Sequence, residues 1–71
     1  MPLVSIELIE GVFSSEQKKD MIKKVTDTMV SIEGENLRQV TWVKVSEIKQ
    51  GDWGIGGQTL TANDVKAMAK G

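Results

Sequence analysis

Two strand-like segments separated by one helical segment set the fold that this chain can adopt. In residues 2–10 and 39–46, successive side chains fall on two different faces of an extended chain, which is typical of strands. In the first segment, one face carries Val4, Ile6 and Leu8, and the other carries Leu3, Ser5, Glu7 and Ile9. In the second segment, one face carries Val43 and Val45, and the other carries Trp42, Lys44 and Ser46. A strand–helix–strand order favours a parallel pair with the helix on one sheet face, because the connection must return the chain to the same end.

The segment between the strands has the signals of one amphipathic helix. Ser14 and Gln17 have the spacing of a capping box at its start, and Gly34 suits a left-handed stop at its end. Apolar residues at helical spacing predict one buried stripe, formed by Met21, Ile22, Val25, Met29 and Ile32. The lysines of the first half are expected on a solvated face: Lys18, Lys19, Lys23 and Lys24. Residues 35–38 then predict a turn.

The C-terminal third predicts two further short elements. Residues 51–57, GDWGIGG, are too rich in glycine for a helix and predict a loop or a tight hairpin. Thr61 and Asp64 again have capping-box spacing and predict a short terminal helix. The expected fold is α/β (α+β by some conventions), with a β–α–β unit, a glycine-rich loop or hairpin and a short C-terminal helix. We expect a single domain over residues 1–71.

The chain has few means of stabilising so small a core by itself. Its 71 residues include neither Cys nor His, so disulfides and His- or thiolate-built zinc, haem or iron–sulfur sites are excluded. Ser–His and Cys–His nucleophilic chemistry is excluded for the same reason, and we expect no metal site. A two-stranded sheet is not stable alone, and the face with Trp42 and Lys44 needs cover. We therefore expect an oligomer of identical chains.

Charge and hydropathy exclude other classes of partner. Nine basic and ten acidic residues give a formal net charge of −1, so the chain lacks the basic excess that nucleic-acid binding requires. No apolar run approaches the length of a membrane span. The N-terminal segment MPLVSIELIEG has acids and no basic region, unlike a signal peptide. The sequence thus predicts a cytoplasmic protein without nucleic-acid or membrane partners.

Two residues are candidates for chemistry. Pro2 follows an initiator-type Met1, whose removal would leave a secondary amine that can serve as a base near neutral pH. The alternative, which position alone favours, is that Pro2 only starts a strand, where its missing N–H is harmless. Trp53 is framed by glycines, which permit a tight turn that places its ring in a cleft or in a subunit interface. Composition alone leaves both alternatives open for each residue.

Four segments, in order over residues 2–57, resemble the 4-oxalocrotonate tautomerase family: MPLVSIELIEG, SSEQKK, WVKVSE and GDWGIGG. The resemblance implies short β–α–β chains that assemble as hexamers and use no cofactor. It implies that Pro2, once N-terminal, is the general base that moves a proton between an enol oxygen and a carbon of a 2-oxo or 2-hydroxydienoic acid. It also implies that Trp53 is the aromatic wall of the site, in the position where the family has an aromatic ring.

The sequence departs from the family pattern at the two arginines that hold the substrate. Val12 and Phe13 stand where the first is expected, and Trp42 stands where the second is expected. The only arginine is Arg38, in the preceding turn. Lys44 shares a strand face with Trp42 and is a candidate substitute that would hold a carboxylate as a point charge. Alternatively, Lys44 is an exposed cation, or it pairs with Glu7 across the sheet.

These observations together predict a tautomerase acting on a small enol or carbonyl compound. Pro2 would be the catalytic base, and Lys44 or Arg38 would offset the substrate charge. The residues expected to wall the site are Trp53, Trp42 and Phe13. One alternative on the same scaffold is hydration or dehalogenation of an unsaturated acid, with Glu7 or Asp52 activating water. Another alternative is a non-catalytic subunit that keeps the hexameric scaffold.

Overall fold

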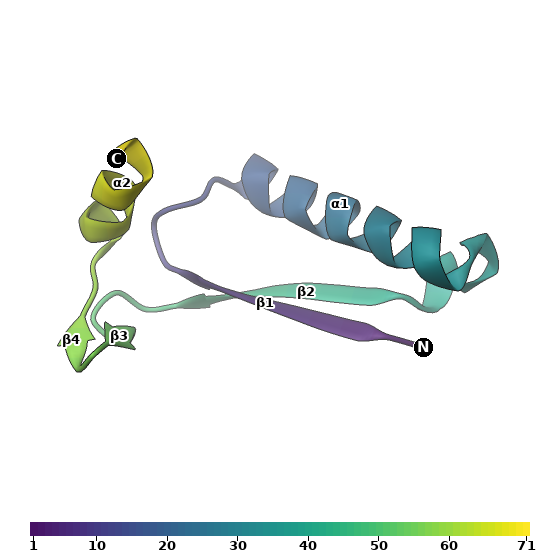
Figure 1. The fold of residues 1–71 in the computed structure, drawn as a ribbon, viewed down its shortest axis with the longest axis horizontal. Coiled ribbons are helices and arrows are strands. Elements are labelled where there is room, and N and C mark those ends of the chain that lie inside the picture. Colours follow the sequence, from purple (N-terminus) through teal and green to yellow (C-terminus); the bar gives the residue numbers. More distant parts are fainter.

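The computed structural model describes residues 1–71 and contains a β–α–β unit followed by a small hairpin and a C-terminal helix (Figure 1). The β–α–β elements are β1 (Leu3–Ile9), α1 (Ser15–Glu33), the 3₁₀ helix η1 (Glu35–Val40) and β2 (Trp42–Ile48). The elements that follow are β3 (Gly54–Ile55), β4 (Gln58–Thr59) and α2 (Ala62–Lys70). This arrangement confirms the fold class expected from the sequence.

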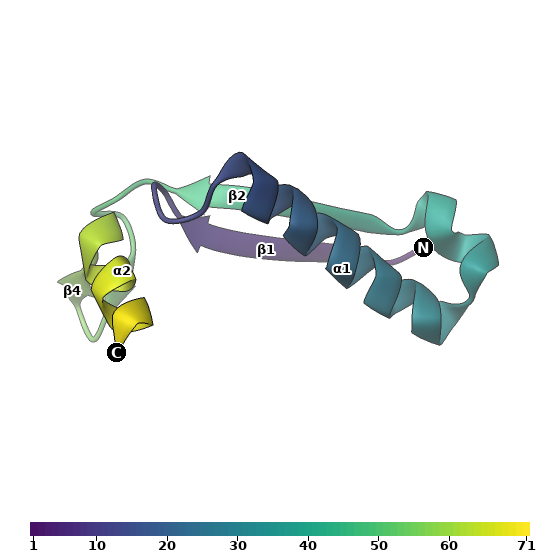
Figure 2. The ribbon, with the colours of Figure 1, turned by 90° about the horizontal axis from the view of Figure 1, so that it is seen from above.

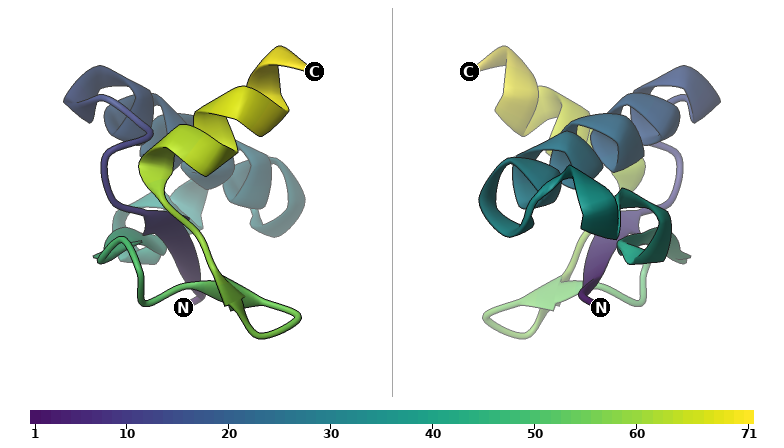
Figure 3. Two further views of the ribbon diagram at one scale, coloured as in Figure 1. Left: turned by 90° about the vertical axis from the view of Figure 1, so that its left-hand side faces the viewer. Right: turned by 90° about the vertical axis from the view of Figure 1, so that its right-hand side faces the viewer.

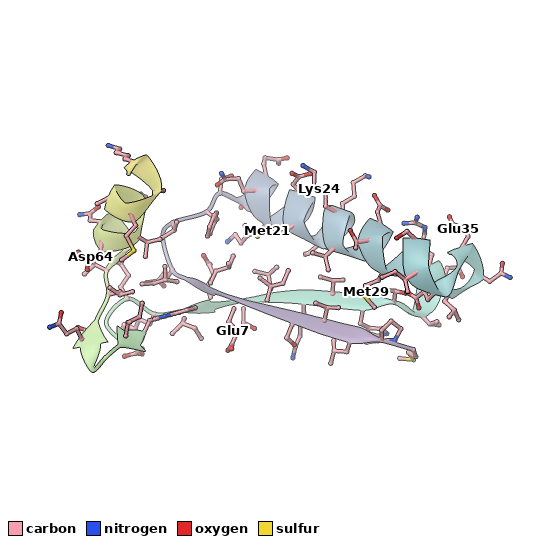
Figure 4. All side chains as sticks on the ribbon, viewed as in Figure 1. Glu7, Met21, Lys24, Met29, Glu35 and Asp64 are labelled. Atoms are coloured by element: carbon pink, nitrogen blue, oxygen red, sulfur yellow. The ribbon has the colours of Figure 1, made fainter.

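Strands β1 and β2 form a two-stranded parallel sheet, as the strand–helix–strand order predicts. Leu3 is level with Trp42 at one end and Ile9 is level with Ile48 at the other. Helix α1 covers one face, toward which Met21 and Met29 point (Figure 4), while the opposite face, which we call the open face, has no element over most of its length (Figure 1). The open face carries Leu3, Ser5, Glu7, Trp42, Lys44 and Ser46, all exposed.

Helix α1 begins as predicted but buries a different set of residues near its end. The Ser14 hydroxyl accepts from the Gln17 backbone N–H at 3.1 Å, and the Gln17 side chain accepts from the Ser14 N–H at 2.9 Å. The predicted stripe is wrong at Ile22 and at Ile32, which is 78% exposed, whereas Val30 is buried. The helix crosses the strands diagonally (Figure 2), so the side that faces the rest of the chain changes along its length.

One lysine of α1 also departs from the expected solvated face. Lys18 is half-buried, and its ammonium lies 3.1 Å from the Glu47 carboxylate of β2. The other three lysines are exposed on the outer side of the helix, and Lys24 points away from the sheet (Figure 4). The Lys18–Glu47 pair therefore links the first turns of α1 to the second strand.

The connection between α1 and β2 corrects the predicted start of the second strand. Gly34 ends α1 with a positive φ of 106°, but its ψ of 149° is extended rather than left-handed helical. Residues 35–40 then form η1, so the strand begins at Trp42 and continues to Ile48, instead of covering residues 39–46. The Thr41 hydroxyl lies 2.7 Å from the Glu33 carboxylate and 2.8 Å from the Leu37 carbonyl, which fixes this junction.

The glycine-rich segment is a hairpin, one of the two predicted forms. Gly56 and Gly57 form its turn with φ of 58° and 84°, the left-handed conformation that two-residue hairpin turns of type I′ require. Helix α2 follows with the predicted capping box, in which the Thr61 hydroxyl and the Asp64 carboxylate each accept from the other's backbone N–H. Hairpin and α2 lie together at one end of the molecule (Figure 3).

The chain by itself has almost no interior. Only Ile9, Val30 and Ala62 are buried, and the molecule measures 43 × 22 × 19 Å. Gly11 lies close against Ala62, so close that a Cβ at Gly11 would be 3.3 Å from the Ala62 Cβ. Neither helix has the length and apolar character needed to cross a bilayer. Because so few residues of this 71-residue chain are buried, most of its apolar side chains keep exposed surface that another chain could cover.

Candidate active site

Pro2 and Trp42 lie side by side at the free end of the sheet. The Trp42 backbone N–H donates to the Pro2 carbonyl at 3.0 Å, which continues the parallel ladder by one residue beyond Leu3. Pro2 is half-buried, and Trp42 is 57% exposed on the open face. This hydrogen bond uses only the carbonyl of Pro2, so its nitrogen takes no part in the sheet.

Lys44 is an unpaired cation on the same face. It lies two residues after Trp42 and is level with Ser5 on β1. Its ammonium forms no ion pair within the chain, so the alternative in which Lys44 pairs with Glu7 is wrong for the single subunit. Glu7 lies on the side of the sheet away from α1 (Figure 4). Lys44 is therefore the one basic side chain of the two strands, and it has no ion-pair partner within the single chain.

Arg38 is engaged by two carboxylates. Its Nη1 donates to Asp27 at 2.8 Å, and its Nε and Nη2 donate to Glu35 at 3.0 and 3.2 Å. These contacts raise the pKa of Arg38 above its ordinary value, and hydrogen bonds from Lys23 and Arg38 lower the pKa of Asp27. Arg38 thus fastens η1 to α1 and has its guanidinium occupied by protein groups.

Trp53 lies at the opposite end of β1 from Pro2. It lines two adjoining hollows, of which one, the acidic hollow, has a volume of about 320 Å³ and contains two carboxylates. The acidic hollow is lined by Glu7, Ile48, Asp52, Trp53 and Gly54. The apolar hollow, of about 250 Å³, is lined by Glu7, Leu8, Ile9, Phe13, Trp53, Ile55, Leu60, Val65 and Met68. Phe13 is therefore grouped with Trp53 and not with Trp42.

The predicted site residues fall into two groups within one chain. Pro2, Trp42, Lys44 and Arg38 belong to the end of the sheet where both strands start, whereas Trp53 belongs to the end where both strands finish. The six residue steps of β1 between Leu3 and Ile9 span about 20 Å, because a strand rises by about 3.3 Å per residue. A single chain therefore does not bring Pro2 and Trp53 into one pocket.

Sequence analysis missed part of the wall of the apolar hollow. Leu60 precedes the Thr61 cap and Val65 stands four positions into the helix, and both line this hollow. That spacing is a hydrophobic staple, a signal that is readable from sequence and that would have placed both side chains together. No three acidic side chains converge as metal ligands.

Comparison with known proteins gives the family. The model of a family described as "Tautomerase enzyme" matches residues 2–63. The chain belongs to the tautomerase family. A probable tautomerase of Dickeya dadantii is 38% identical over 61 residues, which cover 86% of this chain and 90% of that protein.

Solved structures confirm the resemblance to 4-oxalocrotonate tautomerases within that family. The crystal structure of apo unFused 4-OT has a TM-score of 0.72 and 34% identity, covering 90% of this chain and 98% of the other. A structure of 4-oxalocrotonate tautomerase isozymes from Methylibium petroleiphilum has a TM-score of 0.71 and 32% identity, with coverage of 90% and 97%. These tautomerases share the β–α–β fold with the C-terminal helix described above.

Proposed function

We propose that this tautomerase-family chain is a cofactor-independent isomerase in which Pro2, after removal of Met1, is the general base. The observation that carries the proposal is the position of Pro2 at the start of β1. There the Trp42 N–H fixes its carbonyl and leaves its nitrogen outside the hydrogen-bond ladder. Once Met1 is removed, a secondary amine at this partly buried sheet end would have the lone pair that proton transfer needs.

The reaction is the conversion of an enol to its keto form. The Pro2 nitrogen takes the proton of the enol hydroxyl and a proton is returned to the neighbouring carbon. The C=C bond becomes a C–C single bond as the new C–H bond forms, and the C–O bond becomes C=O. A free α-amino group has a pKa near ~8, and partial desolvation of the charged amine lowers that value toward neutrality. The amine can then both accept and return the proton near pH 7.

We also propose that the working enzyme is a homo-oligomer in which neighbouring chains run antiparallel. Such an arrangement would bring the Trp53 end of one chain to the Pro2 end of the next, and would cover exposed Leu3 and Trp42. The charges of the open face favour it, because Lys44 lies toward one end and Glu7 toward the other, so that antiparallel copies place opposite charges near each other. The hexamer implied by the family resemblance stays a prediction.

The proposal is tested with two forms of the same chain. Mass spectrometry identifies preparations with and without Met1, and ketonisation of phenylenolpyruvate is followed for each. The processed form should be active, with one ascending limb in its pH–rate profile, and the form that keeps Met1 should lose nearly all activity because an amide nitrogen is not a base. Pro2→Ala with Met1 removed keeps a primary amine and should lose part of the rate, within the ~10²–10⁴-fold that general-base catalysis supplies. Equal rates for the processed and Met1-retaining forms would exclude Pro2 as the base and favour the non-catalytic alternative.

One observation favours a second candidate function, hydration or dehalogenation of an unsaturated acid. Glu7 and Asp52, the two carboxylates expected to activate water, both line the acidic hollow beside Trp53. Halide release from a 3-haloacrylate tests this candidate. Glu7→Gln and Asp52→Asn should each reduce that release while sparing the ketonisation of phenylenolpyruvate, whereas the absence of any halide release by the native enzyme would reject it.

A further inference from the structure

A further hollow, of about 640 Å³, lies between the start of α1 and the C-terminal helix α2. We call it the basic hollow, and its lining includes Val12, Phe13 and Gln17 on one side and Asn63, Lys66 and Lys70 of α2 on the other. The loop that joins β1 to α1 runs between the two helices, and both helices lie on the same side of the sheet (Figure 1). The basic hollow is therefore on the side of the sheet opposite the open face.

The polar groups of the basic hollow are cations and amides. Lys66 and Lys70 form no ion pair within the chain, and no carboxylate lines the hollow. Each of the other hollows contains at least one carboxylate. The Gln17 side-chain oxygen accepts from the Ser14 N–H, which leaves the Gln17 NH₂ group free to donate, and the Asn63 amide can donate as well. The basic hollow thus combines two positive charges with amide donors and has no negative charge of its own.

The spacing of the two lysines indicates the charge of an anion that would fit. Lys66 and Lys70 are four residues apart on α2, so their side chains leave the helix on the same side. Like charges at this spacing repel each other, and the chain supplies no counter-charge. A group with two negative charges offsets both ammoniums, whereas one carboxylate offsets only one. A phosphate monoester carries close to two negative charges at neutral pH and has three acceptor oxygens.

The apolar part of the lining indicates what the phosphate would be attached to. Val12 and Phe13 are half-buried, and Ala67 of α2 lies on the same side of its helix as Lys66 and Lys70. Phe13 also lines the apolar hollow, so one ring is shared by the two hollows. A phenyl ring offers a flat surface on which another ring can stack. The volume is within the range of small-molecule sites, which is about 300–1,000 Å³.

We propose that the basic hollow binds a small aromatic phosphate monoester at a site separate from Pro2. Lys66 and Lys70 pair with the phosphate oxygens, and the aromatic group lies against Phe13. The proposal concerns binding alone and does not depend on the proposed isomerase activity, because neither Pro2 nor Trp42 lines the hollow.

Nuclear magnetic resonance of the ¹⁵N-labelled native protein tests the site. Phenyl phosphate is added near pH 7.5, where its phosphate is close to doubly charged. The side-chain amide signals of Gln17 and Asn63 should shift and saturate with a dissociation constant of about 1–10 mM, as expected for so small a ligand. The indole N–H signal of Trp42 reports on the Pro2 end and should stay in place. Shifts at Trp42 without shifts at Gln17 and Asn63, or no saturable shift at all, would overturn the proposal.

Two further ligands separate the contributions of charge and ring. Inorganic phosphate has the charge without the ring, and benzoate has the ring with one negative charge. Each should bind several-fold more weakly than phenyl phosphate, because each lacks one of the two matches. Inorganic phosphate that binds as tightly as phenyl phosphate would refute the role of Phe13, and benzoate that binds as tightly would refute the preference for two charges.

Single substitutions assign the cations. Lys66→Gln and Lys70→Gln should each raise the dissociation constant of phenyl phosphate about two- to fivefold, which is the effect of one exposed ion pair. The matched control is Lys49→Gln, because Lys49 also forms no ion pair but lines none of the hollows. The control should bind phenyl phosphate like the native protein. Equal weakening in all three variants would show a general effect of net charge and would overturn the assignment of the basic hollow.

Discussion

Replacement of Leu3 by serine is expected to weaken assembly by an amount that the structure sets. Leu3 is 59% exposed in the single chain and lies on the open face beside Trp42. Full burial of a leucine side chain contributes about 1.5–3 kcal/mol, so covering its exposed share contributes about 0.9–1.8 kcal/mol per subunit. Two subunits contribute about 1.8–3.6 kcal/mol to each pair, which corresponds to a roughly 20- to 400-fold increase in the dissociation constant of Leu3→Ser.

Sedimentation velocity over a concentration series measures this effect. The native chain should sediment as an oligomer, and Leu3→Ser should dissociate at higher protein concentration. Ile32→Ser is the matched control, because Ile32 is more exposed than Leu3 but lies on α1 and not on the open face. A folded monomer of the native chain, or an equal loss of assembly in both variants, would refute the assignment of the open face as the interface.

Three further predictions concern the stability of the subunit, measured as thermal midpoints at one protein concentration. Gly11→Ala should lower the free energy of unfolding by at least about 1–2 kcal/mol, because Gly11 has φ of 87° and a Cβ there would approach Ala62. An unchanged thermal midpoint would show that the contact between Gly11 and Ala62 is not tight. Ser14→Ala should cost about 1 kcal/mol through loss of the capping box, and Ser14→Asp should recover most of it. Hydrogen bonds lower the pKa of Asp27 below its ordinary value of 3.8, so its contribution is present above that pH and is lost as the pH falls through the lowered value. The advantage of the native chain over Asp27→Asn should therefore persist from pH 7 down to 3.8 and shrink as the pH falls further through the lowered pKa, and a constant gap would contradict this assignment.

Local signals in the sequence predicted the helices well, whereas the burial pattern and the strand boundary, which depend on tertiary contacts, were predicted less well. Ser14 and Thr61 form the expected caps, because a capping box needs only residues three positions apart. Ile32 has the right spacing for the buried stripe but is exposed, because the diagonal crossing of α1 changes which side of its last turn is covered. Val40 fits a strand pattern but belongs to η1, where Arg38 holds the backbone against α1.

The sequence nominates residues for the candidate site but does not indicate how they are arranged. The family resemblance names Pro2 and Trp53 together, but their separation along β1 follows from the direction of the strands and from the position of the hairpin. Likewise, the sequence contains one arginine, Arg38, but does not indicate that its guanidinium forms ion pairs with Asp27 and Glu35. The roles of the site residues, the hexamer, the single domain and the cytoplasmic location stay predictions.

The opposite positions of the two termini have a consequence for gene fusion. The N-terminus and the C-terminus lie at opposite ends of a body 43 Å long (Figure 1). A linker joining two copies in the same orientation would need about 13 extended residues, whereas the antiparallel neighbours proposed above would need far fewer, because that arrangement would place the end of one chain near the start of the next. In such a fused chain the second Pro2 would be an internal amide, so a tandem duplicate would have two sheets but a single amine. If Pro2 is the base, as proposed, the second copy of a fused duplicate would take no part in the proton transfer and its sequence would be free to diverge.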